Sequence, residues 1–301
     1  MTSATTRAPP VPVGACRAAL GEGPVWLAEE QALYWVDIRA PMIWRMLWPG
    51  QECRSWTPPF RISALAPRRQ SGFIAATDFI AATDKGFAFI DPEAGDYRLI
   101  AAPEASLPGN RSNDGKVDRA GNFWFGTMDD AEQAETGALY RVAADLSWRW
   151  AGAGYQVPNG PAFSRDGGTI YHTDSARRSV YQCALNEDGT LGDRTIFLSF
   201  SHEDGYPDGM TVDAEDCLWI AFWDGWCVRR FAPDGAPLAR IPLPVQRPTS
   251  CTFGGPDLDL LFITSARVGL SDHELSAQPL AGSLFVVSPG CRGVAEHRFA
   301  G

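Results

Sequence analysis

Several features are missing from this 301-residue sequence, and each absence excludes a class of protein. No apolar run approaches the roughly 18 residues of a membrane-spanning helix, and the Thr-, Ala- and Pro-rich residues 1–14 contain no apolar segment of a secretory signal. Basic residues are few, with 26 Lys and Arg against 36 Asp and Glu, whereas binding to nucleic acid or to an acidic membrane requires a basic face. We therefore expect a cytoplasmic protein with no nucleic-acid or membrane partner.

Paired cysteines are missing as well. The seven cysteines are odd in number and scattered, and no two form a C-x-x-C motif. Because disulfide frameworks and structural zinc sites depend on paired or regularly spaced cysteines, we expect neither. The thiols predicted to be free are those of Cys16, Cys53, Cys183, Cys217, Cys227, Cys251 and Cys291.

Helical periodicity is also absent, and a repeated strand pattern takes its place. Strand-like apolar runs recur at a nearly even spacing along the chain, and most follow a turn signal such as Asp166-Gly167-Gly168. The centres of these runs are Trp35, Phe79, Trp124, Tyr171, Trp219 and Phe262. A second short strand is expected after each run, at 42–47, 86–90, 138–142, 179–185, 228–231 and 283–287.

Six units of about 45 residues, each long enough for four short strands, are typical of β-propeller blades. A large β-sandwich is the alternative, but its strands would not recur at so even a period. The sequence therefore predicts an all-β fold, a six-bladed β-propeller. We expect residues 1–14 to be a flexible N-terminal segment and residues 15–301 to form one domain.

A tandem hexamer, FIAATD, occupies residues 73–78 and again 79–84. Side chains alternate between the two faces of a strand, so a slip by the length of one copy preserves the pattern of inward and outward positions. Either copy could therefore form the strand, and we interpret the other as a strand extension or a bulge without a function.

Four oxygen-bearing side chains lie at the same position of the repeat, here called its phase, in four of the six units. Each precedes the centre of a strand-like run by nearly the same interval, and the four are Glu22, Asn113, Asn159 and Asp208. Equivalent positions of successive blades form a ring about a propeller axis, so these side chains should converge. The other two blades offer serines at this phase, within 63–65 and 250–252.

Two carboxylates and two amide oxygens that meet at a channel would repel one another unless a cation joined them. Oxygen ligands suit calcium, magnesium or manganese, and the four histidines do not share the phase. Taken singly, each of the four residues is more simply explained as a turn residue; four at one phase favour a cation site.

The same residues carry a family resemblance over about residues 16–290. The segments GEGPVW at 21–26, RSNDGKVD at 111–118, GTM at 126–128, NG at 159–160 and PDGM at 207–210 resemble the signature segments of the regucalcin/gluconolactonase family. Within this family the sequence is most similar to bacterial sugar-acid lactonases such as xylonolactonase. The resemblance implies a six-bladed propeller with one divalent cation on its axis.

Residue roles follow from this resemblance. Glu22, Asn159 and Asp208 match the metal ligands, and Asp208 also matches the general base. Arg111 and Asn113 match the substrate-binding pair. The family's acidic substrate contact shortly after Gly-Thr-Met falls on Ala131, between Asp130 and Glu132, and close to Asp129. We expect Asp130 to bind substrate in its place, with Asp129 and Glu132 as alternatives.

The expected function is hydrolysis of sugar-acid lactones, such as gluconolactone, xylonolactone or arabinonolactone, by a monomer or weak homo-oligomer. Calcium is the first expectation for the cation, with Zn²⁺, Mn²⁺, Mg²⁺ or Fe²⁺ as alternatives. His172, Asp174, Asp129 and Asp130 are candidate contacts for sugar hydroxyls. Two other functions stay open: phosphotriester or aryl-ester hydrolysis at the same site, and a calcium-binding regulatory propeller without turnover. No Gly-x-Ser-x-Gly motif supports a serine hydrolase.

Overall fold

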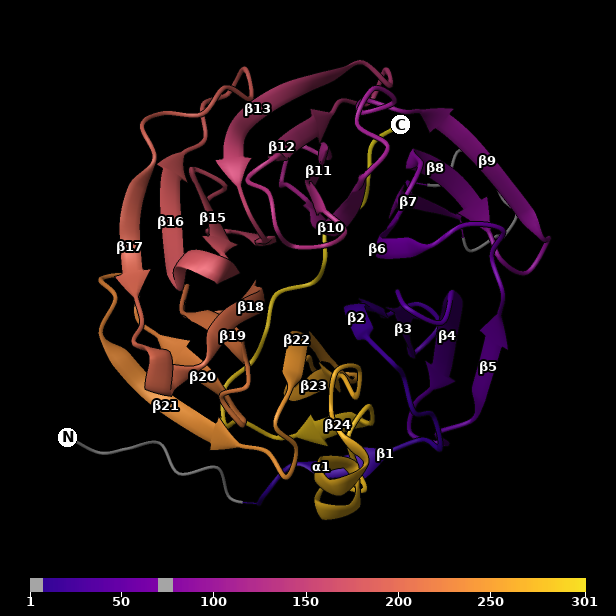
Figure 1. Cartoon of the computed structure of the whole chain (residues 1–301), viewed down its shortest axis with the longest axis vertical. Helices are drawn as coiled ribbons and strands as arrows, with labels where there is room; N and C mark the ends of the chain where they lie inside the picture. Colours follow the sequence, from indigo (N-terminus) through magenta and orange to yellow (C-terminus); the bar gives the residue numbers. More distant parts are fainter. Residues whose placement is uncertain (1–7, 70–77) are drawn as a thin grey trace.

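The computed structural model describes residues 8–69 and 78–301, and this part of the chain folds into six four-stranded antiparallel sheets around a central channel (Figure 1). The first three blades are β2 to β5 (Gly21–Leu27, Ala32–Asp37, Met42–Leu47, Cys53–Trp56), β6 to β9 (Ile62–Pro67, Phe79–Thr83, Gly86–Asp91, Asp96–Ala101) and β10 to β13 (Asn110–Val117, Phe123–Asp129, Gly137–Val142, Trp148–Tyr155). The next two are β14 to β17 (Pro158–Phe163, Thr169–Asp174, Ser179–Ala184, Thr195–Ser199) and β18 to β21 (Tyr206–Val212, Leu218–Trp223, Cys227–Phe231, Pro237–Pro242). The six-bladed propeller predicted from the repeat is confirmed.

The sixth blade is completed by the other end of the chain. Its strands are β22 (Pro248–Gly254), β23 (Leu260–Ser265) and β24 (Leu284–Val287), and β1 (Val11–Val13) supplies the fourth. The expectation of a flexible segment over residues 1–14 is therefore wrong for Val11–Val13. The sixth repeat ends before its outermost strand, so the open edge of β24 pairs with β1, whose Val13 is buried.

The second strand of each blade explains why the repeat is visible in the sequence. Strands β3, β7, β11, β15, β19 and β23 are almost wholly buried, because a neighbouring blade packs on each face. Six clusters of buried apolar side chains lie between the blades, one at each interface. A strand that is buried on both faces reads as a continuous apolar run.

The tandem hexamer and one helix complete the comparison with the predicted elements. The second FIAATD copy supplies β7 (Phe79–Thr83), whereas residues 73–77 of the first copy lie outside the described residues. The short helix α1 (Asp272–Ala277) was not predicted, although its capping box is readable: Ser271 accepts a hydrogen bond from the Glu274 backbone N–H, and the Glu274 carboxylate accepts one in return.

All six innermost strands share a local irregularity. In β2, β6, β10, β14, β18 and β22 the register against the next strand slips at the equivalent place. A bulge of this kind bends a strand and redirects a side chain. The bulged segments therefore turn polar side chains of β2, β10, β14 and β18 toward the channel.

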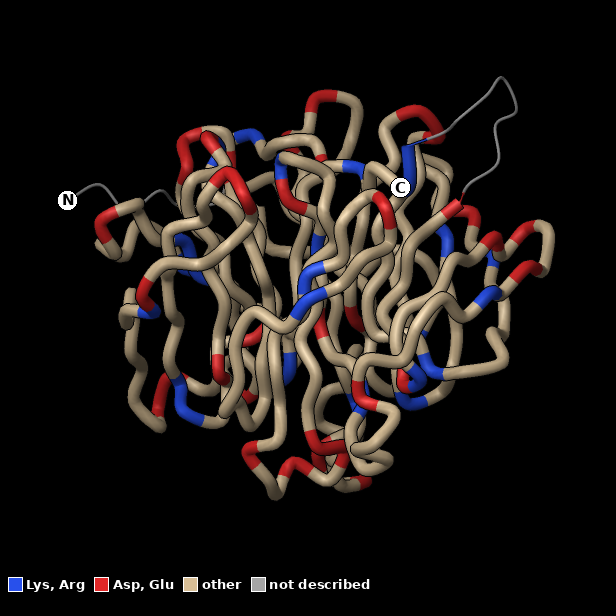
Figure 2. Tube along the Cα trace, turned by 90° about the horizontal axis from the view of Figure 1, so that it is seen from above, with Lys and Arg blue, Asp and Glu red and all other residues tan. Residues whose placement is uncertain are grey.

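The C-terminal segment passes beneath the channel after β24, as the yellow trace in Figure 1 shows. Glu296 accepts hydrogen bonds from Lys116 Nζ at 3.2 Å and from Thr252 Oγ1 at 3.1 Å, and Phe299 packs between the second and third blades. Asp and Glu gather in the loops at the strand ends (Figure 2). Among the described residues no helix is both long and apolar enough to span a membrane, and all seven cysteines are free.

Candidate active site in the central channel

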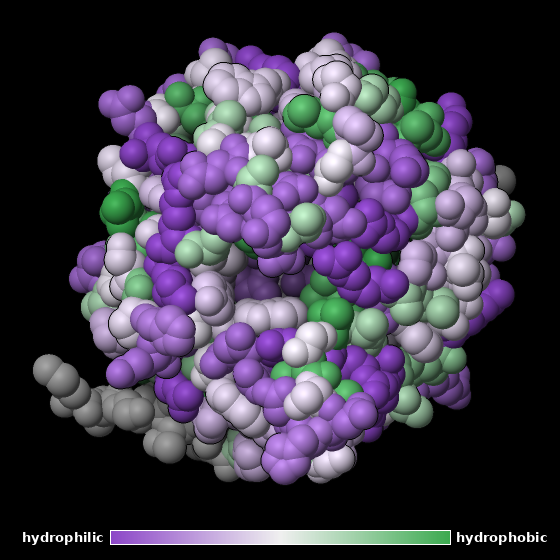
Figure 3. Space-filling view, in the orientation of Figure 1, coloured by the Kyte–Doolittle hydropathy of each residue, from purple (hydrophilic) through white to green (hydrophobic). Residues whose placement is uncertain are grey.

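A cavity of about 690 Å³ opens at one end of the channel. Figure 3 shows the corresponding hollow at the centre of the face, with hydrophilic residues at its floor. The three predicted metal ligands and the predicted substrate-binding pair all line this cavity: Glu22, Asn159, Asp208, Arg111 and Asn113. The shared repeat phase thus brings together side chains from the inner strands β2, β10, β14 and β18, which belong to separate blades.

The bulges of the inner strands set the positions of these side chains. Counted back from the first residue paired after each bulge, Glu22 and Asn159 lie three positions away, whereas Asn113 and Asp208 lie two positions away. The phase inferred from the sequence is therefore right to within one position. All four side chains are buried, with exposed fractions of 6 to 7%.

Burial dominates the electrostatics of the two carboxyl groups at the centre, and the charge of Arg111 opposes it only in part. Burial raises the pKa of Glu22 well above its usual value, and the charges of Asp208 and Asp114 raise it further. Burial likewise raises the pKa of Asp208, again with a contribution from Asp114. Within the described residues neither carboxylate forms an ion pair, and Glu22 accepts only the backbone N–H of Gly23, at 3.1 Å. Buried carboxylates of this kind, beside the amide of Asn159, are a donor set that suits a divalent cation.

A chain of hydrogen bonds crosses three blades beside these carboxylates. Arg111 Nη1 donates to Asn113 Oδ1 at 2.8 Å, and Asn113 Nδ2 donates to Asn159 Oδ1 at 2.8 Å. Asn159 Nδ2 then donates to Ser175 Oγ at 2.9 Å, and Ser175 Oγ donates to the carbonyl of Pro207 at 2.6 Å. Ser175 was not singled out from the sequence, because only the fold brings its hydroxyl against the residue that precedes Asp208.

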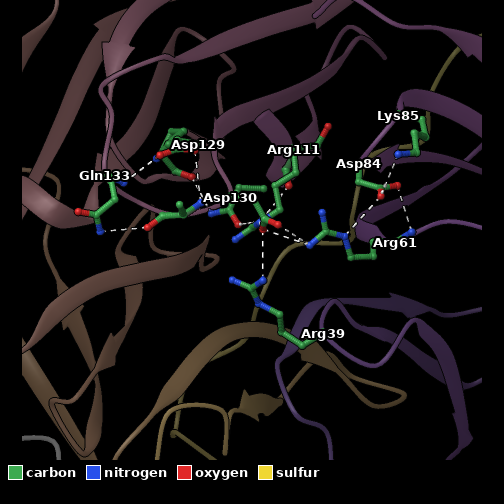
Figure 4. Close-up of polar contacts among 12 residues, drawn as sticks. Arg39, Arg61, Asp84, Lys85, Arg111, Asp129, Asp130 and Gln133 are labelled. Carbon is green, nitrogen blue, oxygen red and sulfur yellow. Dashed lines mark hydrogen bonds and ion pairs between the residues drawn. The ribbon is translucent and has the colours of Figure 1, made fainter. Parts of the chain in front are cut away.

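Asp130, which was predicted to bind substrate, lies among three arginines. Its carboxylate accepts hydrogen bonds from Arg111 Nε at 2.8 Å, Arg61 Nη1 at 2.9 Å and Arg39 Nη1 at 3.2 Å (Figure 4). Partial burial opposes ionisation of Asp130, but these cations together outweigh it and lower the pKa of the carboxyl group. Asp130 lies outside the lining of the central cavity. Three guanidinium groups thus share its two oxygens, and one of them is that of Arg111.

Of the acids after Gly-Thr-Met, Glu132 reaches the cavity. Asp129 instead accepts the backbone N–H groups of Gln133 and Ala134 at 3.0 and 3.1 Å, which shapes the turn. The turn places Glu132 in the left-handed region, with φ of 59°. Counting residues after Gly-Thr-Met leads to Ala131, whereas the residue that reaches the cavity is Glu132, one position later. Counting cannot detect this shift, because it depends on how the loop folds.

The remaining two candidate sugar contacts are structural. His172 lies buried between Tyr155 and Tyr181, with its Nε2 atom 2.9 Å from the Tyr155 hydroxyl. Asp174 is fully buried and accepts the backbone N–H groups of Gln156 and Val157. Neither residue lines the cavity, so the expectation that they contact substrate is wrong.

Comparisons with known proteins find relatives over nearly the whole chain. The family described as "SMP-30/Gluconolactonase/LRE-like region" matches residues 20–267. The chain is 36% identical to 6-deoxy-6-sulfogluconolactonase of Pseudomonas putida, over 94% of this chain and 95% of that protein. It is 35% identical to L-arabinolactonase of Azospirillum brasilense, over 95% and 93%. Among solved structures, the calcium-binding protein regucalcin of Agrobacterium tumefaciens matches with a TM-score of 0.90 and 30% identity, over 97% of each chain.

Proposed function

The chain belongs to the SMP-30/gluconolactonase/LRE-like family, and from this premise we propose how it acts as a sugar-lactone hydrolase. The central cavity is the active site. The observation that carries the proposal is the pair of buried carboxylates, Glu22 and Asp208, which meet Asn159 and Arg111 in one cavity without an ion-pair partner of their own among the described residues.

Glu22, Asn159 and Asp208 would hold one divalent cation. Their fit rests on burial, which raises the pKa of Glu22 and Asp208 so that a cation is needed to favour their ionised forms, and on the all-oxygen chemistry of the set. When bound, such a cation polarises the lactone carbonyl as a Lewis acid. Calcium is the ion named for the regucalcin neighbour; Zn²⁺, Mn²⁺, Mg²⁺ and Fe²⁺ are the alternatives.

Asp208 acts as the general base: its carboxylate takes a proton from the attacking water and delivers it to the ring oxygen that leaves. Arg111 binds the lactone. Its Nε and Nη1 atoms are engaged by Asp130 and Asn113, whereas Nη2 forms no hydrogen bond within the described residues. Nη2 is thus available to a lactone oxygen, and it can stabilise negative charge there as the tetrahedral intermediate forms.

Other residues near Arg111 position its guanidinium group or contact the sugar. Asp130 holds the guanidinium in place rather than touching substrate, and Asn113 fixes its other edge. Glu132 lines the cavity and takes the part of the acidic contact to a sugar hydroxyl. The substrate class spans the hexono- and pentonolactones that the names of the relatives include.

The test separates catalysis from cation binding at Asp208. Asp208→Asn keeps an oxygen for the cation but removes the basic carboxylate, so calorimetric Ca²⁺ affinity should fall moderately. Lactone hydrolysis, corrected for the spontaneous reaction, should fall by about 10² to 10⁴-fold. The matched control is Asp145→Asn, because Asp145 lies in the turn between β12 and β13, outside the cavity. Near-parental turnover by fully loaded Asp208→Asn would remove Asp208 as the base. Turnover of aryl phosphotriesters but of no lactone would refute the lactonase assignment.

A further inference from the structure

One wall of the cavity carries two arginines stacked on aromatic rings. Tyr206 and Trp223 are register partners in β18 and β19. The Arg178 guanidinium carbon lies 4.2 Å from the centroid of the Tyr206 ring, and that of Arg247 lies 4.6 Å from the Trp223 ring. All four residues line the cavity. Stacking of this kind orients a guanidinium group and leaves its edge available for hydrogen bonds.

The charges of the two arginines are balanced differently. Arg247 forms an ion pair with Asp224 at 2.7 Å. Arg178 forms no ion pair and no side-chain hydrogen bond within the part of the chain that the structure describes, and its buried Nε atom has no partner. The other two cavity arginines, Arg39 and Arg111, share Asp130. Arg178 is therefore the cavity cation whose charge the described residues leave unbalanced.

The backbone holds Arg178 in this position. It follows the 3₁₀ turn η1 (Ser175–Arg177) and adopts φ of 51°, and its N–H donates to the Ser175 carbonyl at 2.9 Å. Tyr206, on which it stacks, lies two positions before Asp208 on β18. Two strand positions span about 7 Å. Arg178 and Asp208 thus line one cavity, and the ring on which Arg178 stacks belongs to a residue about 7 Å along β18 from Asp208.

We propose that Arg178 is a specificity residue that binds an anionic group on the exocyclic carbon of the sugar lactone. The ligand chemistry is a carboxylate, sulfonate or phosphate ester, which accepts hydrogen bonds from a planar guanidinium in a forked arrangement. Of the acidic residues that line the cavity, Asp224 is paired with Arg247, and none forms an ion pair with Arg178 within the described residues. The inference rests on the proposed lactonase function.

The test compares glucono-1,5-lactone with its 6-sulfonate and 6-phosphate counterparts. For the parent enzyme, we expect kcat/KM to be at least about 10-fold higher with one or both anionic lactones, which is the range of a charge-assisted hydrogen bond. Arg178→Gln should reduce this selectivity ratio by about 10-fold, mainly through KM. Arg178→Lys should restore part of it. The matched control is Arg177→Gln, since Arg177 is a neighbouring cation that lies outside the cavity lining and pairs with Glu135. It should leave the ratio unchanged.

A second measurement needs no variant. The KM for the anionic lactones should rise with ionic strength more steeply than the KM for the neutral one, because salt screens the attraction of partly exposed charges. The two anionic substrates distinguish sulfonate from phosphate as the preferred group. Equal kcat/KM for neutral and anionic lactones, or an Arg178→Gln ratio equal to that of Arg177→Gln, would overturn this inference. Absence of hydrolysis of all three lactones would instead overturn the proposed function.

Discussion

The hydroxyl of Ser175 offers a direct test of how the site is assembled. It accepts a hydrogen bond from the Asn159 amide at 2.9 Å and donates one to the Pro207 carbonyl at 2.6 Å. It therefore joins blade four, which carries Asn159, to the strand of blade five that carries Asp208. Ser175→Ala removes both bonds without adding volume, and it leaves the Asn159 Nδ2 donor and the Pro207 acceptor short of a partner.

The magnitude follows from these two groups. A buried polar atom that loses its partner costs about 1 to 3 kcal/mol, and Ser175 lines the cavity, so water can replace part of the loss. We expect the free energy of unfolding, measured in urea, to fall by about 1 to 3 kcal/mol. The Asn159 amide is then held by Asn113 alone, so the calorimetric Kd for Ca²⁺ should rise by about 10-fold.

Ser63→Ala is the matched control. Ser63 is a buried serine of β6 at the equivalent bulge, it lies outside the cavity lining, and its hydroxyl makes one long contact, 3.4 Å to the Ala82 carbonyl. This variant should lose less than about 1 kcal/mol, the low end for one hydrogen bond, and keep its Ca²⁺ affinity. If Ser175→Ala matched Ser63→Ala in both measurements, the hydroxyl would have no part in positioning Asn159, and the reasoning would be refuted.

Three further predictions concern other groups. Arg111→Ala should leave the Ca²⁺ Kd within about threefold but lower kcat/KM for lactones by about 10² to 10³-fold through the lost oxyanion contact; a parallel loss of cation affinity would contradict this. Burial lowers the pKa of His172 to about 3, with repulsion from Arg194 adding to it, so its contribution to stability is complete above its ordinary value of 6.5 and is lost as the pH falls from there toward 3. The parent should therefore lose about 1.4 kcal/mol per pH unit more than His172→Gln between about pH 6 and 3.5, as urea unfolding would show, and equal slopes would refute a neutral buried ring. Thiol titration of denatured protein without reductant should find all seven cysteines, and a shortfall of two would indicate a disulfide.

The parts of the fold that the sequence predicted share one physical property. The second strand of each blade is packed on both faces, so its residues, such as those around Trp124 and Trp219, are apolar without interruption. The outer strands are exposed and mixed in composition, and β1, which is very short and next to prolines, has no local signal. Its place is determined by the open edge of β24, a strand from the opposite end of the chain.

The residues of the site also fall into those that could be predicted from the sequence and those that could not. Glu22, Asn113, Asn159 and Asp208 could be found because the inner strands repeat, and a propeller converts equal phase into proximity. Ser175, Glu132 and Arg178 belong to the turns between strands, where the conformation depends on contacts with other blades. Asp130 was found, but its role was not, since the sequence does not reveal that three arginines surround it.

The pairing of β1 with β24 has a consequence for the order in which the molecule assembles. Strand β1 finds its partner only after the chain has been made as far as β24. Blades one to five can therefore form during synthesis while the ring stays open between blades six and one. A circular permutant that begins between two blades and joins residue 301 back to β1 through a linker would bring β24 and β1 close together in sequence. Such a permutant should close its ring faster, because the entropy lost on joining the two strands would be smaller.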